Sequence, residues 1–220
     1  MMKKLLLMLV LCLLLAACGN AEEGDETEVK SETEQGVAVA TVNPLPDTTM
    51  ENLTDAILAV SLEEGDAYVD DSGKMQMDVK IYTYDKYDMV DISNLKVGDI
   101  IVTHAGEVEV NSLERSESGL LYINGGLEEG GFDLVTDESG IFYETGFNDA
   151  KNWYEVGEET IRVSVDFKGY DDADPDKGEV IYYPGDFLIE GVVEYGFTPH
   201  NTTIRVAEGQ IVEMHRVYVP

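Results

Sequence analysis

The feature that most restricts the fold is an alternation of apolar and polar side chains that begins at Met75. Up to Tyr84, odd positions hold apolar residues or threonine, and even positions hold polar residues or tyrosine. An extended strand points successive side chains to opposite faces, so this pattern predicts a half-buried β-strand. Shorter runs rich in Val, Ile, Tyr and Thr follow at residues 99–104, 107–113, 119–124, 132–135, 141–143, 160–167, 179–183, 187–195, 202–206 and 210–219.

Many short strands separated by Gly, Asp and Asn predict an all-β fold, a sandwich or barrel of mainly antiparallel strands. Residues 48–62 are ambiguous. Thr48 and Glu51 match a helical capping box, and the apolar residues that follow have helical spacing. Residues 56–62 also match a buried strand. We favour the strand, because strands dominate the rest of the chain.

The first residues have the pattern of an export signal. Lys3 and Lys4 precede an apolar run at residues 5–15, which ends in the small residues Ala16 and Ala17. A positive start, an apolar middle and a small-residue exit are typical of a signal peptide. The run is too short for a membrane-spanning helix, which needs about 20 residues.

Leu15-Ala16-Ala17-Cys18 resembles the lipobox of bacterial lipoproteins. The resemblance covers residues 1–18 only. It implies cleavage before Cys18 and acylation of that cysteine, which would anchor the protein in the cell membrane on the extracytoplasmic face. Anchoring becomes stable when two or more acyl chains are attached.

The rest of the chain divides by composition. Residues 19–36 are acidic and almost without apolar side chains, which predicts a disordered tether. We therefore expect a signal peptide at 1–17, lipidated Cys18 and an acidic linker within 18–43, and a β-rich domain at 44–220, built as one unit or two small ones. The only other cysteine, Cys12, leaves with the signal peptide, so packing alone would hold the mature domain together.

The charge of the chain narrows its partners. Its 45 acidic and 14 basic residues give a net charge of −31. Nucleic acids bind through Lys and Arg, so they are not expected as partners. The membrane, through the lipid, and a protein or carbohydrate ligand remain. Basic partners or divalent cations suit the acidity, which otherwise serves only to keep the surface soluble.

An acidic stretch is the sharpest candidate for a metal site. Asp172, Asp174 and Asp176 alternate as the first ligands of a calcium loop do, so Ca²⁺ is the one cofactor that the sequence suggests. Lys177 stands where such loops have glycine, and Tyr183 replaces the closing glutamate. The alternative is a solvated hairpin turn without a ligand.

Aromatic residues give a second candidate site. Trp153, Tyr154 and Asn152 lie in a stretch where rings mix with amides and acids, as in sites for sugars or protein partners. The alternative is that these rings belong to the core. The histidines, His104, His200 and His215, have no metal-ligand spacing, so a zinc site shared by the three is not expected.

The chain lacks a serine-nucleophile elbow, a phosphate loop and a zinc-protease motif. We therefore expect a lipid-anchored extracytoplasmic domain that binds a ligand or partner without catalysis. The alternatives are a glycan-directed hydrolase that uses acidic residues and a structural component of the envelope. A close carboxylate pair in a deep pocket, with one pKa raised, would favour the hydrolase.

Overall fold

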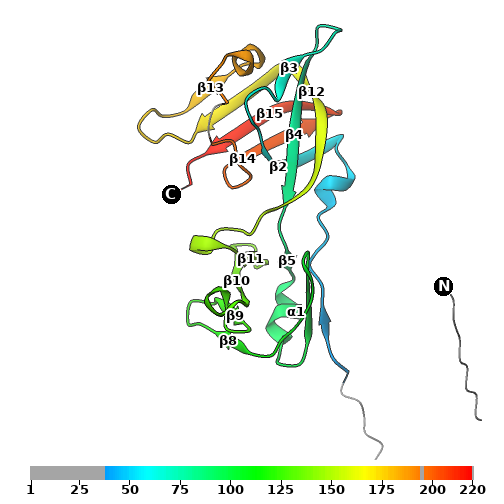
Figure 1. The fold of residues 1–220 in the computed structure, drawn as a ribbon, viewed down its shortest axis with the longest axis vertical. Helices are drawn as coiled ribbons and strands as arrows, with labels where there is room; N and C mark the ends of the chain where they lie inside the picture. The colour runs from blue at the N-terminus through cyan, green and yellow to red at the C-terminus, as the bar shows by residue number, and fades with distance from the viewer. Residues whose placement is uncertain (1–37, 194–195, 220) are drawn as a thin grey trace, which may run out of the picture. The chain divides into compact units, whose positions relative to one another are not determined.

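A computed structural model describes residues 38–193 and 196–219, and these residues form mainly β-strands (Figure 1). The all-β prediction is confirmed, and the architecture is a barrel with additional sheets. Five strands close the barrel: β2 (Asp55–Ser61), β4 (Met75–Thr83), β12 (Tyr154–Asp172), β14 (Thr202–Ala207) and β15 (Gln210–Val217). The signal peptide and Cys18 lie outside the described residues.

The barrel closes because β4 pairs with β12 as well as with β2. Numbered along the chain, its strands follow the order 1-2-3-5-4 and return to 1. The third and fifth strands, β12 and β15, are parallel, and the other pairs are antiparallel. A five-stranded barrel of this order has the topology of the OB-fold. Two short strands extend the sheet at its edges, β3 (Ala67–Val69) beside β4 and β13 (Val180–Tyr182) beside β12.

The interior of the barrel follows the alternation that the sequence shows. In β4, Met77, Val79 and Ile81 are fully buried, whereas the residues between them are partly exposed. The same pattern places Leu58 inside and Ile57, which is 62% exposed, outside. The barrel core is completed mainly by Val60, Ile161, Val163, Phe167, Ile204, Val206, Ile211 and Met214.

A second region consists of the residues inserted between β4 and β12, together with the N-terminal strand β1 (Thr41–Val42). One sheet follows the order β5 (Lys86–Tyr87), β11 (Phe142–Thr145), β10 (Phe132–Thr136), β9 (Leu121–Ile123) and β8 (Leu113–Arg115). A three-stranded sheet contains β1, β6 (Ile100–Thr103) and β7 (Gly106–Glu109). Helix α1 (Met89–Asn94) and the 3-10 helices η2 (Leu127–Glu129) and η3 (Phe147–Asp149) complete the region, which has its own hydrophobic core.

Three sequence predictions need adjustment. Ordered pairing begins before the expected domain start at residue 44, because β1 pairs with β6 and Val42 is buried in the second core. In residues 48–62 the favoured strand is present as β2, and the alternative helix is reduced to a short 3-10 helix η1 (Thr48–Glu51), which is capped by Asp47 and not by Thr48. The strand predicted at 187–195 is wrong over its described part: Phe187 and Leu188 form the end of 3-10 helix η4 (Pro184–Leu188), and residues 189–193 form bends and turns.

Candidate functional site

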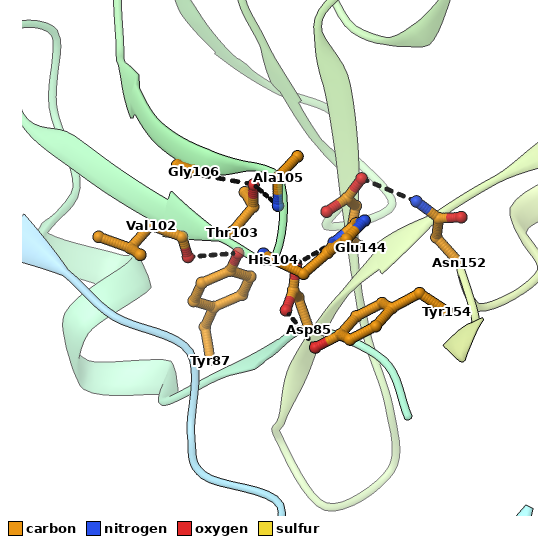
Figure 2. A network of polar contacts seen from close by, with 10 residues as sticks. All are labelled: Asp85, Tyr87, Val102, Thr103, His104, Ala105, Gly106, Glu144, Asn152 and Tyr154. Atoms are coloured by element: carbon orange, nitrogen blue, oxygen red, sulfur yellow. Dashed lines mark hydrogen bonds and ion pairs between the residues drawn. The ribbon is translucent and has the colours of Figure 1, made fainter. Parts of the chain in front are cut away.

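Polar side chains from distant segments converge where β4 and β12 leave the barrel (Figure 2). Asp85 lies between β4 and β5, His104 follows β6, and Glu144 belongs to β11. Asn152 and Tyr154 come from the start of β12 and the residues before it. We call these five residues the polar cluster.

The Asp85 carboxylate is the centre of the polar cluster. Its side chain is only 2% exposed. One oxygen, Oδ2, accepts hydrogen bonds from the His104 backbone N–H and from His104 Nδ1, both at 2.8 Å. The other, Oδ1, accepts from the Tyr154 hydroxyl at 2.9 Å. A buried carboxylate is costly unless donors surround it, and these three bonds meet that need.

The His104 ring is held in place from two sides. It stacks on Tyr154 with ring centroids 4.0 Å apart and planes inclined by 13°. The tight turn after β6 fixes its backbone, because Thr103 Oγ1 accepts from the Ala105 N–H and donates to the Gly106 carbonyl. The imidazole is therefore positioned before any ligand arrives, and a third of its side chain, 33%, remains accessible.

Glu144 is the residue whose hydrogen bonding is incomplete. Its Oε1 accepts from Asn152 Nδ2 at 3.0 Å, but its buried Oε2 has no hydrogen-bond partner among the described residues. Burial raises the pKa of Glu144, and the negative charge of Asp85 raises it further, while the Asn152 hydrogen bond opposes the shift. Ligand atoms of Asp85, His104 and Glu144 lie within 4.8 Å of one another. Two carboxylates and an imidazole therefore share one small space.

Backbone contacts hold these segments together. The Glu144 N–H donates to the Asp85 carbonyl, and the Asn152 N–H donates to the Glu144 carbonyl. The buried Tyr87 hydroxyl donates to the Val102 carbonyl at 3.0 Å, which ties β5 to β6 (Figure 2). The cluster thus rests on paired strands, and such sites keep their geometry better than sites on free loops.

A second group of side chains belongs to the same segments. Each residue of the polar cluster except His104 has a sequence neighbour in this group: Tyr84, Tyr143, Lys151 and Trp153 precede Asp85, Glu144, Asn152 and Tyr154. Consecutive residues of extended segments point to opposite faces, which separates the two groups. Ring and lysine contacts join the four preceding residues, which we call the aromatic cluster.

The predicted ligand residues are divided between these groups. Trp153 belongs to the aromatic cluster, whereas Tyr154 and Asn152 belong to the polar cluster. His215 belongs to β15 and stacks on Tyr170 in the barrel. It is distant from His104 in the sequence and has different contacts.

The acidic loop from Asp171 to Asp176, which contains the predicted calcium ligands, has local partners. Asp174 Oδ2 pairs with Lys177 Nζ at 2.9 Å, and Asp171 Oδ2 pairs with Arg216 Nη1 at 3.1 Å. Within the described residues, the group of possible metal ligands found in close approach is that of the polar cluster, and it contains no residue of this loop. The calcium site stays a prediction.

The chemistry of the polar cluster suits a small ligand. Four surface hollows of the described region, the largest about 830 Å³, are lined by other residues and exclude Asp85, His104 and Glu144. The cluster offers anionic oxygens and an imidazole nitrogen, which are ligands for a divalent metal ion.

Sequence reasoning missed Asp85 and Glu144 because the chain has 45 acidic residues, and nothing local distinguishes these two. The available signal was the repeated dipeptide of an aromatic residue followed by a polar one: Tyr84-Asp85, Tyr143-Glu144 and Trp153-Tyr154.

In the part of the chain that the structure describes, no helix combines the length and apolar character needed to cross a bilayer. Searches for similar proteins found no matching family model, curated protein or solved structure.

Proposed function

We propose that this protein is a lipid-anchored extracytoplasmic binding domain that holds a divalent transition-metal ion on Asp85, His104 and Glu144. The observation that carries the proposal is the Glu144 Oε2 atom, which is buried beside two other ligand groups and has no hydrogen-bond partner in the described part of the chain. An orphaned buried acceptor costs about 1–3 kcal/mol. A bound cation would remove that cost and would offset the charge of the two carboxylates.

The ligand set favours a first-row metal ion such as Zn²⁺ over calcium. Zinc binds imidazole nitrogen and carboxylate oxygen at about 2.0–2.2 Å, whereas calcium takes six to eight oxygens. Two ligand atoms of a tetrahedral zinc site lie roughly 3.3 Å apart at these bond lengths. His104 Nδ1 and Asp85 Oδ2 are 2.8 Å apart. If the two atoms moved apart by about half an ångström and lost the proton they share, the zinc ion could bind between them.

The lipid anchor is the second part of the proposal. It rests on the Leu15-Ala16-Ala17-Cys18 sequence after the apolar run. Intact-mass analysis of the membrane-extracted protein should find a chain that begins at Cys18 and carries acyl groups. The Cys18→Ser variant should lack them. An unacylated chain that retains residues 1–17 would contradict the anchor.

The barrel topology is consistent with a binding role, but the charge of its surface disfavours nucleic acid as the ligand. OB-folds bind oligonucleotides or oligosaccharides on their second and third strands, which correspond here to β4 and β12. In the β4–β12 register, Asp78 lies opposite Thr160, and Glu158 lies opposite Lys80. Glu155 and Glu158 are exposed, so this surface would repel phosphates. A fold alone does not assign a function. The negative charge of this face is the reason why we do not propose a nucleic acid as the ligand.

One observation favours the hydrolase as a second candidate: Asp85 and Glu144 form a close carboxylate pair in which the pKa of Glu144 is raised. Neither carboxylate lines any of the four hollows described above, so none of these four would place a sugar ring against the pair. Release of reducing sugars from a glycan panel by the native chain, lost in Glu144→Gln, would establish the hydrolase.

Isothermal titration of the full chain with Zn²⁺, Mn²⁺ and Ca²⁺ tests the metal site. His215→Ala is the matched control for His104→Ala, because His215 also stacks on a tyrosine and lies 3.7 Å from a glutamate oxygen. We expect Zn²⁺ to bind the native chain and His215→Ala equally, and His104→Ala at least tenfold more weakly. Absence of binding to the native chain, or equal loss in both variants, would refute the proposed site.

A further inference from the structure

The three rings of the aromatic cluster meet edge to face close to the Lys151 ammonium. Tyr84 and Trp153 have ring centroids 4.9 Å apart and planes inclined by 79°. Tyr84 and Tyr143 are 6.1 Å apart at 84°. Rings that meet edge to face cannot form the flat platform on which a sugar stacks, but they can surround a compact group.

The Lys151 ammonium lies within reach of all three rings. Lys151 Nζ lies 4.4 Å from the Tyr84 centroid, 5.4 Å from that of Tyr143 and 5.9 Å from that of Trp153. All three distances fall within the roughly 6 Å over which a cation is attracted to a ring face. Lys151 takes part in none of the ion pairs found among the described residues. Its positive charge is therefore met chiefly by the rings.

Lys151 belongs to a connecting segment, whereas two of the aromatic residues belong to or adjoin paired strands. Lys151 lies between η3 and β12 and joins the sheet through an isolated bridge to Thr145. Tyr143 lies within β11, and Trp153 directly precedes β12. All four members of the aromatic cluster are partly exposed. An external group can therefore reach the rings.

We propose that the aromatic cluster is a binding site for a substituted ammonium cation, with the Lys151 ammonium as its built-in occupant. A quaternary ammonium group is compact, matches the rings without needing hydrogen bonds, and loses less hydration than a primary ammonium. The net charge of −31 also favours cations over anions near the surface. Lys86 Nζ, 5.6 Å from the Tyr84 centroid, is a second cation drawn to the same ring. The site is separate from the polar cluster and needs no metal.

Tetramethylammonium is the simplest probe of this site. The test compares the full native chain with Lys151→Ala and Lys151→Met, all purified in a nonionic detergent, because zwitterionic detergents carry quaternary ammonium groups. Trp153 is the only tryptophan of the chain, so its emission reports on the site directly. Calorimetry gives an independent affinity, and circular dichroism checks that each variant is folded. The neutral isostere tert-butanol separates cation binding from simple filling of an apolar space.

We expect tetramethylammonium to bind at least tenfold more tightly to either lysine variant than to the native chain, because the internal competitor is gone. The double variant Lys151→Met/Tyr84→Ala should lose this gain, and tert-butanol should not bind. Equal affinity in the native chain and a folded lysine variant, including no binding in either, would overturn the proposal. Equal binding of tert-butanol would overturn it as well. Neither result bears on the metal site, which is tested by Zn²⁺.

Discussion

The acidic loop and the polar cluster are the two regions that invite comparison, because both gather carboxylates. The loop places Asp172, Asp174 and Asp176 within five residues, yet Asp174 is already paired with Lys177 and its side chain is 47% exposed. The polar cluster gathers only two carboxylates, but Asp85 is buried and one oxygen of Glu144 has no partner within residues 38–193 and 196–219. The comparison teaches that density of acidic residues is a weaker indication of a site than burial and unmet hydrogen bonding.

The largest effect should come from Asp85→Ala. This change leaves the His104 N–H groups and the Tyr154 hydroxyl without their buried acceptor. We expect the free energy of unfolding to fall by about 3–4 kcal/mol, measured by urea denaturation. Asp85→Asn, which keeps an acceptor oxygen, should lose less. If Asp85→Ala cost no more than Asp174→Ala, the contrast between the two regions would be lost.

Added zinc should stabilise the protein through the polar cluster alone. At a free concentration 100 times the dissociation constant, a ligand that binds only the folded state adds about 2.7 kcal/mol. We expect this gain in the native chain and in Asp174→Ala, but not in His104→Ala. Thermal unfolding with Zn²⁺ and with EDTA measures the difference. If Zn²⁺ did not stabilise Asp174→Ala, the zinc site would lie in the acidic loop and not in the polar cluster.

Glu144→Gln should separate stability from binding. The raised pKa of Glu144 means that folding favours its protonated form, so stability falls as the pH rises from the usual glutamate pKa through the raised one. Without metal, we expect Glu144→Gln to gain about 1 kcal/mol at pH 7.5 and little at pH 4. The same variant should bind zinc more weakly. Urea denaturation midpoints at the two pH values, in EDTA, provide the measurement. An equal gain in the free energy of unfolding at both pH values would show that the ionisation of Glu144 does not cause the stabilisation.

The smallest effect should come from Asp174→Ala. Exposed ion pairs contribute about 0–1 kcal/mol, so we expect a change of at most about 0.5 kcal/mol in the free energy of unfolding. Calorimetric titration with Ca²⁺ before and after the change tests the predicted calcium site directly. No heat in the native chain would dismiss that site. Heat that Asp174→Ala abolishes would place a second cation site in the acidic loop.

Much of the fold was predictable, because strand formation has a local signature. The alternation from Met75 gave the buried face of β4, and most of the predicted runs contain strands. The strand predicted at 187–195 does not form at its start, because 3-10 helix η4 extends to Leu188. This helix is stabilised at its N-terminus by the Asp186 carboxylate, which accepts from the Tyr183 N–H at 2.7 Å. Barrel closure was not predictable, since it depends on pairing between β4 and β12, which the inserted region separates in the sequence.

The candidate site was predictable only in fragments. Tyr154 and Asn152 were identified for their residue types, but as ligands for a sugar or protein, and the structure places them as hydrogen-bond donors to Asp85 and Glu144. His104 was considered only together with His200 and His215. Its actual partner, Asp85, is 19 residues away in the sequence and has no motif in common with it.

By itself, the sequence determined the all-β character, because alternating side chains and turn residues act over a few neighbours. It also carries the signals from which the leader and Cys18 anchor are predicted. Only the tertiary structure decided which acidic residues, Asp85 and Glu144 among 45, lie beside the His104 imidazole. The physical reason is that burial belongs to no single segment: the bond from Tyr154 to Asp85 spans 69 residues and exists only once the strands have paired.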